Sequence, residues 1–405
     1  MSYTFVKVDR YYPGYLAYYY SRFPQVKYWS YEKQLSHLYD DAFALSDFFS
    51  KNLAANGVNA HEIIENAGPL QDAWKKENGV QDSGYDLLIE QLNKLQPDVV
   101  FLNAGRTPFH MVERIREKVK SIRRLVGNCS APYREGDLKE FASYDFVITC
   151  SAGIELTLGH RGIKVYHMNH AFEHTLLPKV MENNGYEESD VLFTGSLGFG
   201  ENYHNIRRDT ITALLQQGIN VSLRASTAEI SPFRHYARCG AYAVASTMKK
   251  LGLLNLAKSI PLLGRATEWR SMPKRDSYPD VIKKNARPPL FGIEMLKAMH
   301  TARIAFNSHI DMAGDYAANM RLFEATGVGT CLVTDWKKNL HELFAPESEV
   351  VSYRNVEECI EKIKWLLDHP AERARIAKAG HERTLKEHTW NKRIPELDHI
   401  IRKNL

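Results

Sequence analysis

The sequence has few cysteines and none of the spacings by which cysteines commonly hold a metal ion. Five cysteines stand singly in 405 residues, at Cys129, Cys150, Cys239, Cys331 and Cys359. No CxxC knuckle is therefore present, and isolated cysteines argue against a disulfide framework. The sequence predicts a protein of the reducing cytoplasm.

Long apolar runs are also missing. A membrane-spanning helix needs about 20 consecutive apolar residues, and no stretch of this sequence approaches that length. The N-terminus, MSYTFVKVDRYYPGY, lacks a basic region followed by an apolar one, so we expect no signal peptide. With 44% hydrophobic and 25% charged residues, the composition is that of a soluble globular protein, and the length favours two domains.

What the sequence does contain is an alternation of strand-like and helix-like segments. The first series of expected strands comprises residues 3–8, 97–105, 123–132, 145–151 and 165–172, with helices at 40–57, 107–119 and 136–144. A second series comprises expected strands at 190–200, 219–225, 303–309 and 348–355, with helices at 204–218, 291–302, 356–369, 371–388 and 390–405. Such alternation predicts right-handed βαβ units and parallel sheets. The fold class is therefore α/β, with two Rossmann-like domains facing a cleft and residues 176–190 as their connector.

One segment, NMRLFEATGVGTCLVTD (residues 319–335), begins as a helix and ends as a strand. The free N–H groups of a helix N-terminus suit a phosphate. Asn319 and Arg321 lie in that first turn, and Arg321 adds a planar cation able to bind phosphate oxygens. Glu324 lies about one turn deeper, and its carboxylate can accept hydrogen bonds from a ribose diol. The segment predicts a nucleotide-diphosphate site, although a surface helix with a capping glutamate would show the same spacing.

Parallel sheets bind ligands beyond the carboxyl ends of their strands. In the second series this rule selects further donor-site candidates, which are Gly195, Ser196, Arg207, Arg208 and Asn307. His309 follows Asn307 at the same strand end, and a phosphate or sugar contact competes there with a structural role. Arg207 and Arg208 would reach a diphosphate, or would lie on a solvated helix face.

In the first series the same rule selects Gly14, His110 and His170 on the acceptor side. His110 lies at a helix start after a strand and is a candidate base for the attacking hydroxyl, although surface histidines are common there. His167 and His170 have a spacing that metal ligands use, but no third ligand lies near them in the sequence. Packing or acceptor contact is the simpler interpretation for His170.

Several of these segments resemble a known family. Residues 319–393, together with FTGSLG (193–198), PPLFGIEML (288–296) and RIAFNSH (303–309), resemble the C-terminal half of bacterial GT-B glycosyltransferases, and the closest group is the spore-protein-like set of family 1 type. YYPGYLAYYYSRFPQVKYWSYEKQ (11–34) and NAGPLQDAW (66–74) resemble their N-terminal counterparts.

The resemblance implies an enzyme, a glycosyltransferase of the EC 2.4 class that moves a sugar from a nucleotide-diphosphate sugar to an acceptor. It implies an acceptor domain at 1–185, a donor domain at 186–385 with a basic insertion at 226–288, and a C-terminal helix at 386–405 that packs on the N-terminal domain. The acceptor would be a cell-surface glycan, a lipid-linked molecule or a protein. An epimerase of the same fold and a non-catalytic nucleotide-sugar-binding protein are the alternatives.

The resemblance also implies roles for single residues. Glu324 matches the glutamate that holds the nucleotide ribose in retaining relatives. Those relatives carry a second glutamate eight positions earlier, where this chain has Tyr316. They also often have a histidine where this chain has Asn128-Cys129-Ser130. We expect His110 and His309 to be catalytic, with no cofactor and no essential metal.

The charge of the chain is unevenly placed. Residues 224–287 hold thirteen Lys/Arg and four Asp/Glu, a net charge of +9, while the whole chain carries +5. Residues 241–287 mix these cations with apolar residues, which is typical of peripheral contact with an anionic membrane. A helical excursion with its charges in water is the alternative. No aromatic-interleaved basic motif is present, so nucleic-acid binding is not expected.

Overall fold

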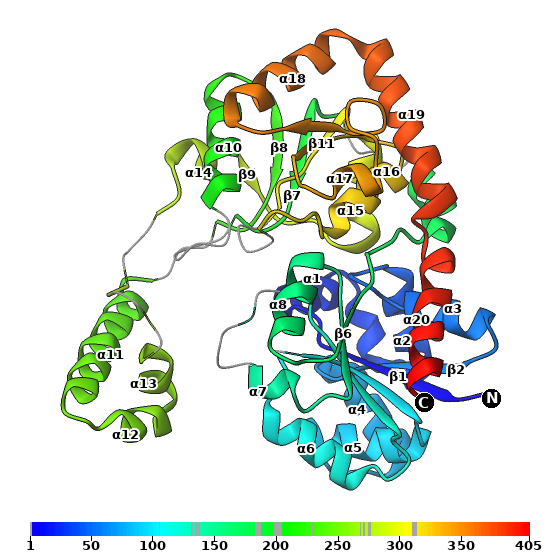
Figure 1. Cartoon of the computed structure of the whole chain (residues 1–405), viewed down its shortest axis with the longest axis vertical. Helices are drawn as coiled ribbons and strands as arrows, with labels where there is room; N and C mark the ends of the chain where they lie inside the picture. The colour runs from blue at the N-terminus through cyan, green and yellow to red at the C-terminus, as the bar shows by residue number, and fades with distance from the viewer. Residues whose placement is uncertain are drawn as a thin grey trace. The chain divides into compact units, whose positions relative to one another are not determined.

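The computed structural model describes residues 2–104, 106–130, 133, 138–182, 188–197, 205–227, 231–267, 269, 272–273, 277–309 and 314–405. Its strands form two six-stranded sheets (Figure 1), and every strand pairing recorded within them is parallel. The expected α/β class with two Rossmann-like sheets is therefore confirmed. The chain divides into two compact units, one of residues 1–192 and 290–405 and the other of residues 193–289. The domain boundaries expected from the sequence stay a prediction.

The first sheet has the strand order β2-β1-β3-β4-β5-β6. Its strands are β1 (Thr4–Asp9), β2 (Asn59–Ile64), β3 (Val99–Asn103), β4 (Arg124–Asn128), β5 (Phe146–Thr149) and β6 (Val165–His167). The order reverses between β1 and β3, and the carboxyl ends of strands at such a reversal are where open α/β sheets bind ligands. Asp9 and Asn103 occupy those two ends.

Alternate residues of these strands enter two different cores, because successive side chains of a strand point to opposite faces. Phe5, Phe101 and Val126 face one core, whereas Val6 and Val100 face the other. The helices of this half are α1 (Pro13–Arg22), α2 (Tyr31–Asp40), α3 (Phe48–Ala55), α4 (Gly68–Asn78), α5 (Gly84–Leu95), α6 (Phe109–Lys118), α7 (Leu138–Phe141) and α8 (Ala152–His160).

The helix expected over residues 40–57 forms only as α3. The segment that precedes α3 contains Ala42, Ala44 and Ser46, whose φ angles are positive, at 52°, 55° and 38°. A right-handed helix cannot contain such residues. Strand β2 was not expected, because the buried Glu62 interrupts its apolar pattern. Helices α1, α2, α4 and α5 were also not expected as helices.

The second sheet has the strand order β12-β11-β10-β7-β8-β9. Its strands are β7 (Val191–Thr194), β8 (Val221–Arg224), β9 (Ala286–Arg287), β10 (Ile304–Phe306), β11 (Cys331–Asp335) and β12 (Val351–Tyr353). The helices are α9 (Leu177–Met181), α10 (Asn205–Gln216), α11 (Pro232–Lys250), α12 (Leu254–Ser259), α13 (Pro261–Ala266), α14 (Asp280–Asn285), α15 (Gly292–Thr301), α16 (Met320–Gly327), α17 (Leu340–Leu343), α18 (Val356–Asp368), α19 (Pro370–Glu387) and α20 (Trp390–Asn404). Helix α16 and strand β11 are the helix and strand expected for residues 319–335.

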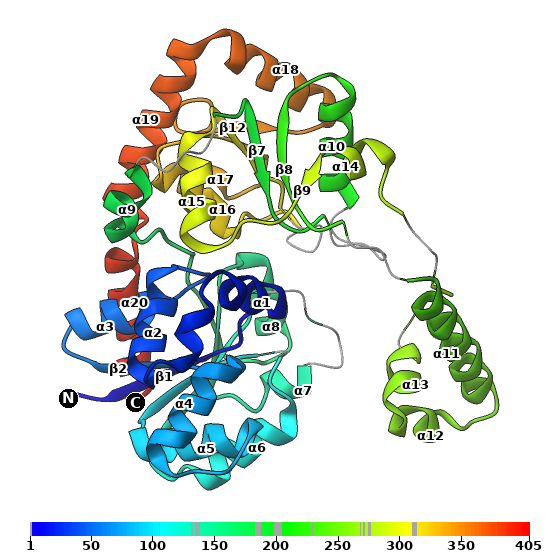
Figure 2. The same cartoon turned by 180° about the vertical axis from the view of Figure 1, so that it is seen from behind.

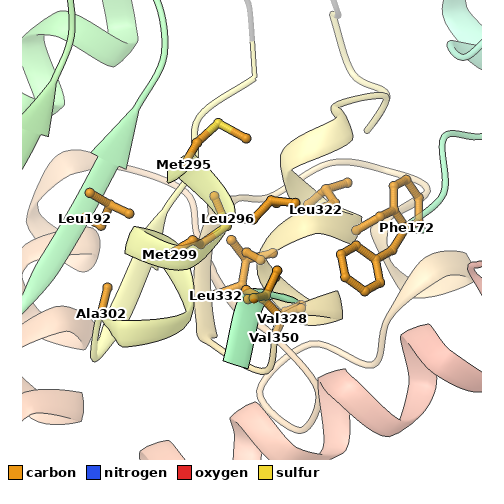
Figure 3. Close-up of a cluster of buried hydrophobic side chains, with 14 of the residues drawn as sticks. Phe172, Leu192, Met295, Leu296, Met299, Ala302, Leu322, Val328, Leu332 and Val350 are labelled. Carbon is orange, nitrogen blue, oxygen red and sulfur yellow. The ribbon is translucent and has the colours of Figure 1, made fainter. Parts of the chain in front are cut away.

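The core beside β10 and β11 is built mainly from α15 and α16 (Figure 3). Leu296, Met299, Leu322 and Leu332 are buried together there. Phe172 joins this core although it follows β6 of the first sheet. Its ring lies against Gly327, where an added Cβ atom would stand 2.3 Å from the nearest ring atom. Gly327 is therefore required by packing.

Helix α20 returns to the first sheet, as expected for the C-terminal helix. Trp390, Ile394 and Leu397 are buried in the same core as Phe5 and Phe101, and the red helix α20 can be followed in Figures 1 and 2. The crossing is tied to the chain around Phe172 by backbone hydrogen bonds. Phe172 N donates to His388 O at 2.9 Å, and Trp390 N donates to Phe172 O at 3.0 Å.

Candidate functional site

The N-terminus of α16 is held at the carboxyl ends of β10 and β11. The side-chain oxygen of Asn319 caps the helix by accepting from Arg321 N at 2.9 Å. Its Nδ2 donates to Asn307 Oδ1 at 2.8 Å, and Asn307 Nδ2 donates to Thr334 Oγ1 at 2.9 Å. This chain of amides places the positive end of the α16 dipole beside the strand ends, as an anion site requires.

His309 and Asp335 meet at the same strand ends. Nδ1 of His309 lies 2.7 Å from Asp335 Oδ1, and the backbone N–H of His309 donates to the same oxygen at 2.8 Å. A carboxylate partner keeps the imidazole proton on Nδ1. In the neutral ring Nε2 is then an acceptor, and it is buried without a hydrogen-bond partner in the described part of the chain. A buried polar atom of this kind calls for a ligand or water to satisfy it.

The charge of Asp335 is stabilised locally. Burial alone would raise the pKa of its carboxyl, but His309 and Lys337 hold that pKa well below its usual range. Lys337 Nζ lies 3.3 Å from Asp335 Oδ2 and also donates to Gly314 O at 2.7 Å. Asp335 is therefore a permanent anion that orients His309. Sequence reasoning missed it, because a lone aspartate after a buried strand is common.

Glu324 and Arg321 form an ion pair on successive turns of α16. The Glu324 carboxylate is only 13% exposed, and Arg321 Nη1 also reaches Met295 Sδ at 3.0 Å. Arg321 thus leans along its own helix and orients the carboxylate. The expected direct contact of Arg321 with phosphate stays a prediction.

Tyr316, eight residues before Glu324, has no carboxylate, and its ring packs against α8. An added Cβ atom at Gly153, in α8, would lie 3.0 Å from the ring of Tyr316. The neighbouring Asp315 forms an ion pair with Lys338, and both side chains are exposed. Neither residue reproduces the second glutamate of the retaining relatives.

The remaining donor-side candidates lie in the other compact unit. Arg207 is buried and donates to Ser196 O at 2.8 Å, and its guanidinium lies 5.7 Å from the centre of the Phe193 ring. Gly195 N donates to Arg224 O at 3.3 Å. The side chain of Arg207 therefore binds the backbone of the loop after β7, whereas Arg208 forms an ion pair with Asp209. Their roles toward a donor stay predictions.

The acceptor-side candidates do not form one cluster. Gly14 lies exposed in the first turn of α1, and His110 lies exposed at the second position of α6. His170 is half-buried after β6, and burial, reinforced by the nearby cation Arg393, lowers the pKa of its imidazole to about 4. His170 is consequently neutral at physiological pH. None of the hydrogen bonds found in the described residues joins these three.

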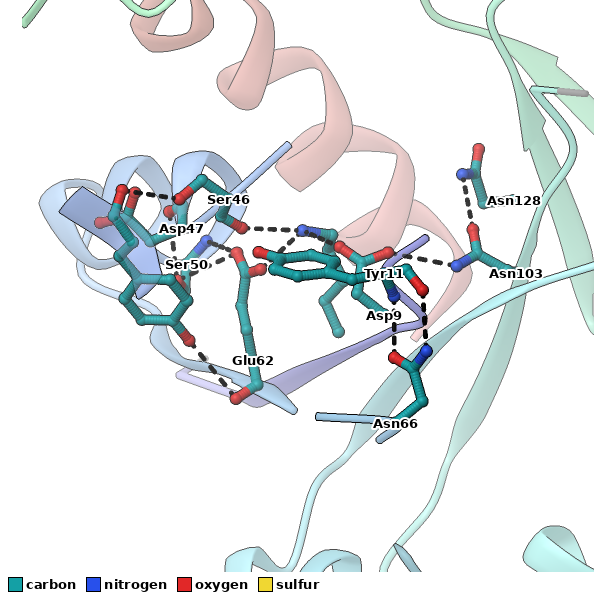
Figure 4. A network of polar contacts seen from close by, with 11 residues as sticks. Asp9, Tyr11, Ser46, Asp47, Ser50, Glu62, Asn66, Asn103 and Asn128 are labelled. Carbon is teal, nitrogen blue, oxygen red and sulfur yellow. Dashed lines mark hydrogen bonds and ion pairs between the residues drawn. The ribbon is translucent and has the colours of Figure 1, made fainter. Parts of the chain in front are cut away.

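A buried polar network at the carboxyl end of β1 was not expected (Figure 4). Lys7 Nζ lies 2.9 Å from Asp9 Oδ2 and 2.6 Å from Glu62 Oε2. Asn103 Nδ2 donates to Asp9 Oδ1 at 3.1 Å, and Asn128 Nδ2 donates to Asn103 Oδ1 at 3.3 Å. The ends of β1, β3 and β4 are thereby joined, and Asp9 stands at the reversal of strand order.

The charges of this network are shared. Burial alone would lower the pKa of Lys7, but the two carboxylates raise it, so Lys7 stays protonated. Burial also raises the pKa of Glu62 to about 7. The Lys7 ammonium offsets only part of this effect, because it interacts with Asp9 as well and the Asp9 charge repels that of Glu62. The sequence signal was a lysine inside an apolar strand, followed two residues later by an aspartate.

No group of three or more His, Cys, Asp or Glu side chains suited to a metal ion occurs among the residues that the structure describes. The expectation that the protein needs no metal stays a prediction.

The chain was compared with protein families, curated proteins and solved structures. Residues 237–398 match the family described as glycosyl transferase-like. The sequence matches none of the curated proteins.

Three solved structures illustrate the fold likeness. Sucrose-phosphate synthase from Thermosynechococcus elongatus is 12% identical with a TM-score of 0.56, covering 99% of this chain and 98% of that chain. A glycosyltransferase from Rickettsia africae is 11% identical with a TM-score of 0.53, covering 100% and 98%. Anabaena HepE in complex with UDP and glucose is 11% identical with a TM-score of 0.55, covering 99% and 100%. The fold is that of the GT-B glycosyltransferases, as expected. The spore-protein-like subgroup stays a prediction.

Proposed function

We propose that this chain, a GT-B glycosyltransferase by its family match and its fold, takes its sugar from a nucleotide-diphosphate donor bound at the carboxyl ends of β10 and β11. The observation that supports this site is the buried His309–Asp335 pair beside the capped N-terminus of α16. A helix N-terminus suits a diphosphate, and a fixed imidazole suits a sugar hydroxyl. The structure of HepE, which has the same fold, is a complex with UDP and glucose.

Each residue of the proposed site has a distinct task. The first-turn N–H groups of α16 stabilise the charge that develops on the leaving diphosphate. Asp335 holds His309 so that Nε2 accepts from a hydroxyl of the sugar. Glu324 accepts from the ribose hydroxyls, and Arg321 keeps its carboxylate in place. These groups bind and orient the donor, and none of them requires a metal ion.

The acceptor side is proposed at the carboxyl ends of β1, β3 and β4. Asp9 is the carboxylate at that edge, and the Lys7 and Asn103 contacts fix its position. Its side chain is 14% exposed, so a hydroxyl of the acceptor can reach it. The proposals for His110, Gly14 and His170 as acceptor-side residues remain alongside it. We also propose that the protein is cytoplasmic and that its basic residues 241–287 hold it peripherally at a membrane.

Incubation with a panel of nucleotide-diphosphate sugars tests the function. We expect a nucleoside diphosphate to be released from at least one donor, by transfer or by slow hydrolysis, as measured by chromatography. A donor whose sugar is altered while the nucleotide stays attached would instead indicate an epimerase. Binding of a donor without any turnover, with and without candidate acceptors, would indicate a binding protein.

A further inference from the structure

A three-helix segment lies between β8 and β9, in the unit of residues 193–289. Its helices α11, α12 and α13 span residues 232–266 and pack against one another (Figure 2). The core that they share is small, because its buried members are Ala241, Ala245 and Ala266, with Leu263 and Trp269 partly buried against them. This small core leaves seven large apolar side chains of the segment exposed.

Those apolar residues are on the surface. Sixteen large hydrophobic side chains are exposed in the described part of the chain, and seven of them fall within these 35 residues. They are Phe233, Tyr236, Val244, Leu251, Leu253, Leu256 and Ile260. Phe233 is 81% exposed, Tyr236 71% and Leu251 68%. Such a concentration on a small segment marks an interaction surface, since single exposed hydrophobics are normally scattered.

Four of the seven lie along one side of α11 and its C-cap, Leu251. Tyr236, Val244 and Leu251 follow Phe233 by 3, 11 and 18 residues, and these offsets return to nearly the same side of a helix with 3.6 residues per turn. The buried Ala241 and Ala245 lie beside this stripe, about 80° and 120° around the helix from Phe233. Helix α11 therefore has an apolar stripe that its own neighbours do not cover.

The charges of the segment all have one sign. Residues 232–266 contain six Lys/Arg and no Asp or Glu. Because the whole chain carries +5, the other residues together carry 5 − 6 = −1. Arg234, Lys249, Lys250 and Arg265 are exposed, and the side chain of Lys258 lies outside the described residues. An apolar stripe flanked only by cations complements a surface that is anionic outside and apolar beneath.

We propose that helices α11–α13 are a docking surface for an anionic lipid bilayer. The side chains of Phe233, Tyr236 and Leu251 enter the boundary between head groups and acyl chains, and the flanking cations meet the lipid phosphates and carboxylates. No described helix is both long enough and apolar enough to cross a bilayer, so the contact is one of insertion at the surface. Docking itself does not depend on the proposed transferase activity, although it would bring a donor-loaded enzyme to a membrane-borne acceptor.

Co-sedimentation of the full chain with vesicles tests this proposal. We expect binding to vesicles of phosphatidylcholine that contain phosphatidylserine, weak binding to pure phosphatidylcholine, and weaker binding at high salt. The variant Lys249→Ala/Lys250→Ala/Arg265→Ala should lose roughly 10- to 100-fold in affinity for the anionic vesicles. The variant Phe233→Ser/Tyr236→Ser/Leu251→Ser should lose binding while its charge is unchanged. All six side chains are exposed, so we expect both variants to fold.

A matched control removes three cations elsewhere. Lys378, Lys386 and Lys392 are exposed on α19 and α20, and Lys378→Ala/Lys386→Ala/Lys392→Ala should keep most of the binding. The proposal is overturned if anionic vesicles are not bound at low salt, or if the apolar variant binds them as the unaltered chain does. Binding to DNA but not to vesicles would also overturn it, in favour of a nucleic-acid partner. Release of nucleoside diphosphate by hydrolysis in solution, measured on the same variants, reports separately on the proposed function.

Discussion

His309 and Asp335 are joined twice, because one carboxylate oxygen lies 2.7 Å from the imidazole Nδ1 and accepts the backbone N–H of the same residue at 2.8 Å. This double contact fixes both the ring and its proton. The pair stands where β10 and β11 end, so its rigidity can be used by a ligand that approaches those strand ends.

The first prediction concerns this pair. Asp335→Asn leaves the size of the side chain nearly unchanged but removes the charge that keeps the proton on Nδ1. We expect kcat/KM for nucleoside-diphosphate release to fall by roughly 10- to 100-fold, which corresponds to about 1.5–3 kcal/mol for a hydrogen bond to a charged group. Asp368→Asn, on the exposed end of α18, is the matched control. Full activity in folded Asp335→Asn would show that the pair is structural only.

The second prediction concerns Glu324. Glu324→Ala should weaken nucleoside-diphosphate binding by about 1–3 kcal/mol, because its carboxylate accepts from ribose hydroxyls. Calorimetric titration with ribo- and 2′-deoxyribonucleotides separates this role from an indirect effect through Arg321. The unaltered chain and the exposed control Glu361→Ala should prefer the ribonucleotide, and Glu324→Ala should lose that preference. An equal preference in all three proteins would remove Glu324 from the ribose.

The third prediction is that an excess of EDTA leaves sugar transfer or donor hydrolysis unchanged. The expected source of charge stabilisation is the N-terminus of α16, and no His, Cys, Asp or Glu group of the described residues has the arrangement of a metal site. The assay is nucleoside-diphosphate release with and without chelator. Loss of activity that Mg²⁺ or Mn²⁺ restores would show that a metal takes part.

The fourth prediction concerns pH and Asp41. Burial raises the pKa of the Asp41 carboxyl from 3.8 to about 6, even though Tyr15 OH donates to it at 2.9 Å. A carboxyl whose folded pKa is raised binds its proton more tightly in the folded state. The free energy of unfolding should therefore fall as pH rises from about 4 to about 6, by up to about 3 kcal/mol for this group.

Asp41→Asn should remove that part of the pH dependence and stabilise the protein above pH 6. Urea unfolding at pH 4.5 and 7.5 measures the difference, and Asp40→Asn, an exposed neighbour on α2, is the control. If the two substitutions change the pH dependence equally, the burial of Asp41 is not its cause.

The fifth prediction separates the two glycines that end α16. Gly327→Ala places a methyl group into the Phe172 ring and should destabilise the protein by about 1–3 kcal/mol, the usual range for overpacking. Gly329 has φ +85° and only ordinary contacts for a Cβ atom, so Gly329→Ala should cost about 1–2 kcal/mol of backbone strain instead. Phe172→Ala should relieve the first substitution and not the second. Additive effects in both double variants would contradict this assignment.

The sequence predicted the parts of the fold that local pattern controls. Strands such as β3 and β11 are short apolar runs with clear ends, and α16 has both a capping asparagine and a closing glycine. Strand β2 was missed, because the charge of Glu62 is buried against Lys7 and the pairing partner lies 55 residues away. Local pattern contains no information about such a partner.

The same limit applies to the candidate site. His309 and Asn307 were predicted because strand ends bind ligands, whereas Asp335 was not, because its contact with His309 depends on the pairing of β10 with β11. Asp9 was missed for the same reason, since its contact with Asn103 exists only once β1 and β3 are neighbours. Residue type and spacing identify a strand end, and sheet order decides which strand ends meet.

Phe172 and Trp390 are each buried in the core of the other half of the chain. Phe172 follows the last strand of the first sheet but is buried beside β10 and β11, whereas Trp390 follows α19 but is buried beside β1 and β3. Each core is thus completed by a ring from the other half of the chain, and the backbone N–H of Trp390 donates to the backbone oxygen of Phe172. Two fragments made by dividing the chain between these halves would each lack a central residue of a core. The two halves of the intact chain should therefore unfold in a single cooperative step. The separate fragments should regain structure only when both are present.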